Sequence, residues 1–216
     1  MRDQCAQHWR EVVRPHQPLD DNHGIARELY GRPLRHSGAT LRSRDRAAWP
    51  RAAARPSAAS GGWLAARDAG GGTGRIAAQL RPLVGQLVIS DQSRPMLRQA
   101  QAKAAAAPVQ ARVERLPFPD AAFARVLVVD ALYHFAAQPA AIRELLRVLA
   151  PGGRLVIEEP DIELPAVKLV ALAERLAGMG STFNRPATIQ AMVAAHGHTA
   201  RVERDGRFAA WVIVDI

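Results

Sequence analysis

Residues 63–80 read WLAARDAGGGTGRIAAQL, which has the form of a strand end, a glycine turn and a helix start in direct succession. Asp68 stands at the end of the expected strand, and the expected helix begins with residues 76–80. Glycines in the turn let the backbone bend tightly and approach a bound molecule: Gly70, Gly71, Gly72 and Gly74. Unpaired amide N–H groups at the helix start would face such a molecule. The stretch therefore predicts an α/β fold with a ligand at this turn.

A glycine turn after a strand is a weak signal by itself, since many α/β proteins use glycine there for geometry alone. Gly72, Gly74 and Ala77 also fit the dinucleotide fingerprint G-x-G-x-x-A. A nicotinamide or flavin ligand therefore stays open at this point, and features further along the chain must decide.

The chain has 216 residues, of which 48% are hydrophobic, so it can bury one full core. We expect two parts: an irregular or poorly ordered segment over residues 1–60, and a regular domain over residues 61–216. Residues 42–62 mix Arg, Ala, Pro, Ser and Gly without an apolar period. A short helix near residues 25–30 is the one element expected before the domain, and the segment as a whole could be the remnant of a lid.

The formal charge of +9 would ordinarily suggest an anionic partner such as nucleic acid. Only two of the 29 basic residues are lysine, which indicates a GC-rich coding bias rather than a binding patch. No apolar run is long enough for a signal peptide or a membrane span. The lone Cys5 allows neither an internal disulfide nor a cysteine-based metal site. These features lead us to expect a cytoplasmic protein with no membrane partner and no metal.

Strands and helices alternate after the glycine turn. We expect strands at residues 86–91, 109–113, 125–130 and 154–159, and helices at residues 94–106, 139–149, 165–177 and 186–196. Asp205-Gly206 between two apolar runs is a strong hairpin signal, so the last two strands should be antiparallel. This order predicts a doubly wound sheet with a reversed C-terminal strand.

Asp91 ends the second expected strand, 17 residues beyond Gly74. A carboxylate at that place can accept hydrogen bonds from both hydroxyls of a ribose. The alternative is an acid that only stabilises the start of the following helix through its dipole.

Three further features stand where a nucleoside ligand would need them. The stretch Arg112-Val113-Glu114 precedes Leu116-Pro117-Phe118, where a base ring could lie against apolar side chains and a backbone amide. Asp130 is followed by Leu132, Tyr133 and His134, beside the place of a transferred group. The sequence PGGRL at residues 151–155 is a feature that a dehydrogenase does not require.

Together these stretches resemble the class I S-adenosylmethionine-dependent methyltransferases, in particular the small-molecule group (methyltransferase type 11) that includes the menaquinone and ubiquinone methyltransferases. The resemblance rests on DAGGGTG at 68–74, SDQSRPMLRQA at 90–100, ERLPFPDAAFARVLVVDALYHF at 114–135 and RELLRVLAPGGRLVIEEPD at 143–161. It covers the chain from about residue 63 onward. It implies a Rossmann-like, seven-stranded sheet whose reversed last strand comes from the terminal hairpin.

The resemblance also implies S-adenosylmethionine as the cofactor. The glycine loop would hold its methionine part, Asp91 its ribose and residues 112–114 its adenine, while Asp130 would border the sulfonium. The family usually has an acid where Arg112 stands, so the contact there would come from the backbone. The implied cofactor site consists of Asp68, Ala69, Gly70, Gly71, Gly72, Thr73, Gly74, Asp91, Gln92, Met96, Arg112, Val113, Glu114 and Asp130.

His134 is the best placed candidate for a catalytic base, should the methyl acceptor have to lose a proton. Its alternative is a packed histidine in the wall of the pocket. The residues after Asp130 do not form the N-P-P-Y type sequence associated with methylation of nucleobases, which argues against a nucleic-acid substrate. The expected acceptor is a small molecule that the sequence does not identify. The sequence contains no motif that indicates whether oxygen, carbon or sulfur is methylated, and none that indicates the oligomeric state.

Two other functions stay open. The chain could be an inactive methyltransferase-like module that binds a partner through its arginine-rich first 60 residues. It could also be a nicotinamide oxidoreductase, although the second and third of the features above would then have no explanation.

Overall fold

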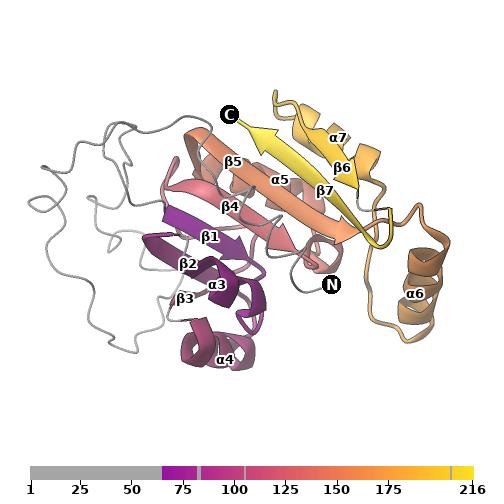
Figure 1. Ribbon diagram of the computed structural model, residues 1–216, viewed down its shortest axis with the longest axis horizontal. Coiled ribbons are helices and arrows are strands. Elements are labelled where there is room, and N and C mark those ends of the chain that lie inside the picture. Colours follow the sequence, from indigo (N-terminus) through magenta and orange to yellow (C-terminus); the bar gives the residue numbers. More distant parts are fainter. Residues whose placement is uncertain (1–64, 82–83, 105, 205) are drawn as a thin grey trace, which may run out of the picture.

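The computed structural model describes residues 65–81, 84–104, 106–204 and 206–216, and Figure 1 shows their arrangement. The irregular segment expected over residues 1–60, with its short helix, lies outside the described residues. The strands are β1 (Ala65–Ala69), β2 (Gln86–Asp91), β3 (Ala107–Gln110), β4 (Phe123–Val129), β5 (Leu149–Pro160), β6 (Arg201–Arg204) and β7 (Ala209–Asp215). The helices are α3 (Arg75–Leu80), α4 (Arg94–Ala104), the 3₁₀ helix η4 (Leu132–His134), α5 (Gln138–Val148), α6 (Pro165–Leu176) and α7 (Pro186–Ala194).

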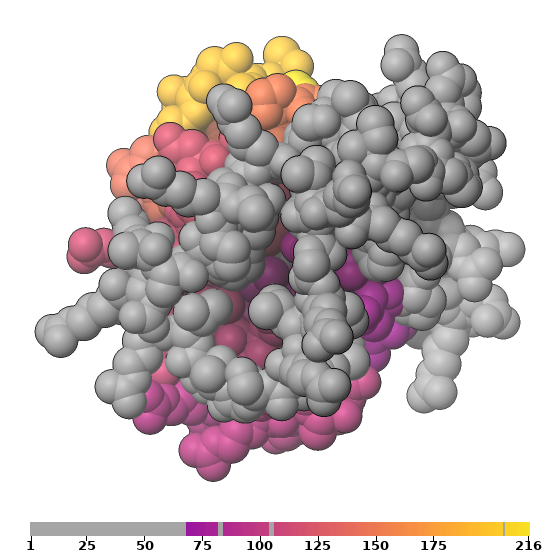
Figure 2. All heavy atoms as spheres, turned by 90° about the vertical axis from the view of Figure 1, so that its left-hand side faces the viewer, coloured from indigo at the N-terminus to yellow at the C-terminus, as the bar shows by residue number. Residues whose placement is uncertain are grey.

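The strands form one sheet in the order β3-β2-β1-β4-β5-β7-β6. The pairs along β3-β2-β1-β4-β5 are parallel, whereas β7 runs antiparallel to both of its neighbours. The chain therefore winds outward from β1 in both directions, and the predicted doubly wound sheet with a reversed last strand is confirmed. Figure 2 shows the two flanks of the sheet at opposite ends of the molecule, with the C-terminal elements in yellow and the β2 to α4 region in magenta.

Both faces of the sheet are covered because its central strands are apolar on both sides. Along β4, Val126 and Val128 belong to one buried cluster, which includes residues of α5 and α7. Leu127 and Val129 point the other way and belong to a second cluster, which includes residues of α3 and α4. This alternation is the two-residue period of a strand, and it explains why residues 126–129 are apolar without interruption.

Strand β3 ends earlier than the sequence predicts. It covers Ala107–Gln110, whereas the expected strand was 109–113. The last backbone hydrogen bond between this segment and β2 joins the Ala111 amide to the Asp91 carbonyl oxygen. A turn follows, in which the Arg115 amide donates to the Arg112 carbonyl oxygen. Val113 is buried although it lies beyond the ladder. Alternating burial at residues 109, 111 and 113 therefore imitates a strand pattern without the pairing.

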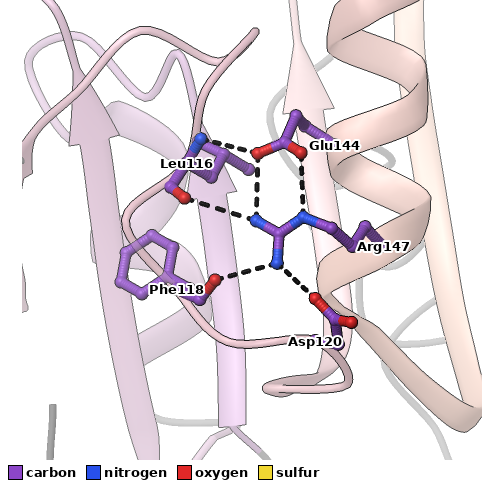
Figure 3. A network of polar contacts seen from close by, with 5 residues as sticks. All are labelled: Leu116, Phe118, Asp120, Glu144 and Arg147. Carbon is purple, nitrogen blue, oxygen red and sulfur yellow. Dashed lines mark hydrogen bonds and ion pairs between the residues drawn. The ribbon is translucent and has the colours of Figure 1, made fainter. Parts of the chain in front are cut away.

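The loop between β3 and β4 is fixed to α5 by one arginine, as Figure 3 shows. The Arg147 guanidinium donates to both oxygens of Glu144 at 2.8 and 2.9 Å and to the carbonyl oxygens of Leu116 and Phe118 at 3.3 and 2.9 Å. It also pairs with Asp120 at 2.7 Å. The buried Glu144 accepts the Leu116 amide at 2.8 Å. Charge-assisted bonds of this kind hold an otherwise irregular loop in one conformation.

The carboxyl ends of β1, β2, β4 and β5 meet at one edge of the sheet, because parallel strands end on the same side. Helix α6 follows β5 at this edge and stands apart from the body of the molecule (Figure 1). Within the described part of the chain, no helix has the length and apolar character needed to cross a membrane.

Candidate functional site

The glycine loop joins the end of β1 to the start of α3. Gly70, Gly72 and Gly74 have φ values of +73°, +50° and +75°, a region in which residues with a side chain are strained. A Cβ on Gly74 would lie 3.0 Å from the backbone Cα of Ala100, so this glycine also lets α4 pack closely. A Cβ on Gly72, in contrast, would meet no atom of the described residues within 4 Å. As far as these residues are concerned, space is open beside the loop at Gly72.

Two acids converge on this loop, as the sequence predicts. The Asp91 carboxylate accepts the Gly72 amide at 3.1 Å and the Ser93 amide at 2.7 Å. Asp68 is buried one residue before the end of β1, and a Cβ on Gly71 would lie 2.7 Å from its carboxyl carbon. Asp68 thus supports the loop from behind, while Asp91 lies beside it. The remaining loop residues differ in exposure: Ala69 is buried and Thr73 is half-buried.

Gln92 and Met96 lie on the outer side of the same region. The Gln92 carbonyl oxygen accepts the Gln110 side-chain amide at 3.1 Å, which joins the ends of β2 and β3. Met96 is exposed in the first turn of α4, five residues after Asp91. Both side chains are accessible, and their role toward a ligand stays a prediction.

Arg112, Val113 and Glu114 form the turn that follows β3. The exposed Arg112 pairs with Glu114 at 3.4 Å, and Glu114 also accepts the Ala137 amide at 3.3 Å. Although burial works against it, hydrogen bonds from its own backbone, from Arg112 and from Ala137 hold the pKa of Glu114 below its ordinary value. Glu114 is therefore ionised and links this turn to the start of α5.

The expectation that a base ring lies against Leu116 and Phe118 is wrong. Both side chains are buried in the core, where the Phe118 ring meets Phe123 edge to face at 5.0 Å between centroids. The Leu116 amide is taken by Glu144 at 2.8 Å. The stretch therefore faces α5, and only the preceding turn at residues 112–114 borders the edge of the sheet.

Asp130 follows β4 directly and has a positive φ of +50°, which turns the chain sharply at the edge of the sheet. Its carboxylate pairs with Arg75, the first residue of α3, at 3.0 Å. Burial raises the pKa of Asp130 above its ordinary value, and Arg75 works in the opposite direction. This ion pair connects the start of α3, just after the glycine loop, to the end of β4. The structure therefore brings together two of the predicted features, the glycine loop and Asp130.

The turn after Asp130 is built around Glu159, a residue for which the sequence suggests no role. The buried Glu159 carboxyl accepts three successive backbone amides: those of Ala131 at 3.0 Å, Leu132 at 2.8 Å and Tyr133 at 3.1 Å. Burial raises its pKa to about 8, although the three amides work in the opposite direction. Glu159 lies near the end of β5, the strand that pairs with β4, and this position is the sequence signal that could have indicated a contact with the turn after β4.

Tyr133 and His134 lie against the segment that follows α6. The Tyr133 ring stacks on Phe183 at 4.4 Å between centroids, and its carbonyl oxygen accepts the Thr182 amide at 2.8 Å. The His134 Nδ1 atom lies 3.2 Å from the Ser181 hydroxyl. His134 is exposed and has a hydroxyl partner, so the structure does not support the alternative of a packed histidine, and its role as a base stays a prediction.

Carboxyl groups dominate the electrostatics around Tyr133. Burial first, and then Asp130, Glu159 and Glu174, raise the pKa of the Tyr133 phenol to about 12. Glu174 comes from α6, and its buried Oε2 atom has no hydrogen-bond partner among the described residues. The sequence does not indicate Glu174, because α6 and η4 are distant along the chain and approach each other only in the folded protein. This part of the site favours a cation and keeps the phenol protonated as a donor.

The described residues include no group of three or more His, Cys, Asp or Glu side chains arranged to hold a metal ion.

Comparison with known proteins places these features in a family. A family model described as "Methyltransferase domain" matches residues 67–157, from β1 into β5. Ubiquinone/menaquinone biosynthesis C-methyltransferase from Pseudomonas putida is 40% identical over an alignment of 116 residues that covers 49% of this chain and 44% of that protein. The chain thus matches less than half of the length of this relative.

Solved structures agree with the fold. The YcgJ protein from Bacillus subtilis superposes with a TM-score of 0.59 at 26% identity, covering 66% of this chain and 64% of that one. Magnesium protoporphyrin IX methyltransferase from Synechocystis, solved with bound SAH, gives a TM-score of 0.56 at 20% identity, with 71% and 74% covered. At such low identity the second likeness concerns the fold alone.

One relative is matched over most of its length. Demethylmenaquinone methyltransferase from Thermus thermophilus is 33% identical over an alignment of 164 residues that covers 63% of this chain and 74% of that protein. This match extends well beyond the glycine loop and agrees with the strand order and the matched family model. The chain belongs to the class I S-adenosylmethionine-dependent methyltransferases.

Proposed function

We propose that this protein binds S-adenosylmethionine along the carboxyl edge of its sheet and transfers the methyl group to a small molecule by direct displacement. The observation that carries the proposal is the bond between Asp91 and the Gly72 amide. The acid expected to hold a ribose thus touches the loop expected to hold an amino-acid tail, which supports one ligand that spans both.

The residues present fit this cofactor. The space at Gly72 is open, so a ligand can approach the backbone of the loop. Asp91 offers carboxylate oxygens on the next strand, and the turn at residues 112–114 stands where the adenine is expected. Asp130 and Glu174 make the neighbourhood of Tyr133 acidic, which suits a positively charged sulfonium. The Arg112 side chain is exposed, which is consistent with a contact made by the backbone of this turn.

The cofactor, when bound, supplies an electrophilic methyl group, so the protein's task is mainly to position the acceptor. The turn at residues 131–134 is fixed by Glu159, and it presents the Tyr133 phenol and the His134 imidazole at the same edge. Two groups could take a proton from an acceptor. One is His134 with its Ser181 partner, and the other is Glu174, whose buried Oε2 atom has no hydrogen-bond partner among the described residues.

For the acceptor we propose a quinol-type ring that is methylated on carbon. The names of the two curated relatives, a ubiquinone/menaquinone biosynthesis C-methyltransferase and a demethylmenaquinone methyltransferase, support this class. The stacked rings of Tyr133 and Phe183 form a flat apolar wall, which suits a planar aromatic substrate. Removal of the proton from a ring hydroxyl would raise the nucleophilicity of the neighbouring carbon, so His134 or Glu174 would act there.

Calorimetric titration tests the cofactor, and mass spectrometry tests the acceptor. We expect heat of binding with both S-adenosylmethionine and S-adenosylhomocysteine, and a mass increase of one methyl group on a short-chain demethylnaphthoquinol. No heat with either ligand at millimolar concentration would overturn the proposal. Binding without methylation of any quinol would leave the cofactor in place and overturn the acceptor class.

The same titration separates the enzyme from an inactive binding module. Such a module would fold normally and give no heat with either cofactor form. We favour the enzyme because the loop keeps an open approach at Gly72 and the ribose acid Asp91 is present beside it.

A further inference from the structure

Helix α6 (Pro165–Leu176) carries a row of exposed leucines. Leu169, Leu172 and Leu176 recur at i, i+3 and i+7, so they share one face, and their exposed fractions are 69%, 53% and 80%. On the opposite face Val167 is buried against the body of the protein and Glu174 is half-buried near Tyr133. The helix thus leans on the site with one side and presents apolar side chains to the outside with the other.

Charges on α6 are divided between its two sides. Lys168 and Arg175 are seven residues apart, share a face and lie beside the leucine row, and both are exposed. Glu174, the acid of this helix, lies toward the body, and Glu163, just before the helix, pairs with Arg204 at 2.8 Å. An apolar row flanked by basic residues, with the acids turned away, is the pattern of a helix that lies in the surface of an anionic membrane.

The base of α6 is held firmly, so its outer face has a fixed direction. The buried Asp161, just before the helix, pairs with Arg204 of β6 at 2.9 Å and accepts the Glu163 amide at 3.0 Å. After the helix the chain reaches the site through Ser181, which lies 3.2 Å from His134. Figure 1 shows the helix standing away from the sheet, where a flat surface can reach it.

We propose that α6 docks this protein on the surface of an anionic phospholipid bilayer, with Leu169, Leu172 and Leu176 in the interface and Lys168 and Arg175 at the headgroups. The contact is with the surface of the bilayer, since no helix of the described residues is long and apolar enough to cross it. The net charge of +9 adds a weaker general attraction to the same surface. Docking would bring the segment 181–184 close to the lipids, so an apolar acceptor could pass from the bilayer to the site.

Co-sedimentation with vesicles tests this proposal on the full chain without any cofactor, so its outcome does not depend on methyl transfer. The probes are vesicles of phosphatidylcholine mixed with phosphatidylglycerol, and vesicles of phosphatidylcholine alone. The chain has two lysines, one on α6 and one on α4. The pair K168Q/R175Q on α6 therefore has a matched control in R98Q/K103Q on α4, where both residues are also exposed.

The unchanged protein should bind the anionic vesicles and bind the neutral ones much more weakly. K168Q/R175Q should weaken anionic binding by about fivefold for each charge removed, whereas R98Q/K103Q should change it by less than about twofold. L169S/L172S/L176S should abolish it, with an unchanged circular dichroism spectrum because these side chains are exposed.

Several results would overturn the proposal. One is absence of binding by the unchanged protein, and another is equal loss in the α6 and α4 charge variants, which would indicate attraction by net charge only. Undiminished binding of the leucine variant would exclude the apolar row. Sedimentation velocity provides the remaining outcome: a dimer that becomes a monomer in the leucine variant, with no vesicle binding, would assign the row to a second copy of this chain.

Discussion

The Asp91 carboxylate accepts a hydrogen bond from the Gly72 amide at 3.1 Å, across 19 residues of sequence. The same carboxylate accepts the Ser93 amide, so Asp91 joins the glycine loop to the turn before α4. The two predicted ends of the cofactor site are therefore built as one unit. A change at Asp91 should affect both the shape of the loop and the binding of ribose.

Asp91→Ala should weaken binding of S-adenosylhomocysteine at least about tenfold and lower the free energy of unfolding by about 2 kcal/mol, because two amides lose a charged acceptor. Calorimetry and urea unfolding measure the two effects. Glu203→Ala, which removes an exposed acid from β6, is the control and should change neither. Unaltered affinity of the Asp91 variant would remove the ribose role from this residue.

Gly72→Ala should separate stability from binding. Gly72 and Gly152 both have positive φ, +50° and +74°, and a Cβ on either would meet no atom of the described residues within 4 Å. Alanine at each should therefore lower stability by a similar amount, about 1–2 kcal/mol. Only the methyl group at Gly72 enters the space proposed for the cofactor, so only that variant should bind S-adenosylhomocysteine poorly. Equal binding by the two variants would contradict this placement.

Arg75→Ala should raise the affinity for S-adenosylmethionine relative to S-adenosylhomocysteine. The Arg75 guanidinium offsets part of the negative charge of Asp130, which is the acid proposed to border the sulfonium, and only S-adenosylmethionine carries the positive sulfonium charge. Stability should change by less than about 1 kcal/mol, since the side chains are 63% and 39% exposed. Arg75→Lys, which keeps the charge, should leave the affinity ratio close to that of the unchanged protein. A ratio that does not differ between the two variants would contradict the prediction.

Glu159 should make stability depend on pH. Its pKa is about 8 in the folded protein against an ordinary value of 4.5, so folding retains a proton that the unfolded chain releases between these values. This stabilisation is complete below pH 4.5 and should be lost as the pH rises through about 8. Urea unfolding at a series of pH values should show the decline, and Glu159→Gln should flatten it. An identical slope in the variant would assign the decline to other groups.

Arg147→Met should lower the free energy of unfolding by about 2–4 kcal/mol, because Glu144 and two loop carbonyl groups lose their partner at once. Arg143→Met, on the same helix and exposed, is the matched control and should change it by less than about 0.5 kcal/mol. Thermal or urea unfolding of the two variants measures the difference in the free energy of unfolding. Similar values for both variants would show that the loop needs no such anchor.

The sequence predicts the elements that a continuous apolar pattern defines. The expected strand at residues 125–130 is found as β4 (Phe123–Val129), the expected helix at 139–149 as α5 (Gln138–Val148), and the expected C-terminal hairpin as the antiparallel pair of β6 and β7. Burial on one or both faces dictates the composition of these elements. The boundary of β3 could not be predicted, since Val113 is buried without pairing. Pairing depends on a neighbouring strand, which local sequence does not contain.

The site divides in the same way. Its glycine loop and the acids at the ends of β2 and β4 follow from local order along the chain, and the structure brings them to one edge. Glu159 and Glu174 act through contacts with η4 that join distant parts of the sequence, 26 residues apart for the bond from Tyr133 to Glu159. A local sequence pattern does not predict a contact between residues so far apart in the chain.

The stacked rings of Tyr133 and Phe183 have a consequence for protein engineering. The turn after β4 and the segment after α6 meet through these rings, through a backbone bond and through the His134 and Ser181 side chains. A chimaera that imports one of these pieces from another enzyme would leave half of each contact unmatched. Any exchange intended to alter which compound receives the methyl group must therefore transplant both pieces together.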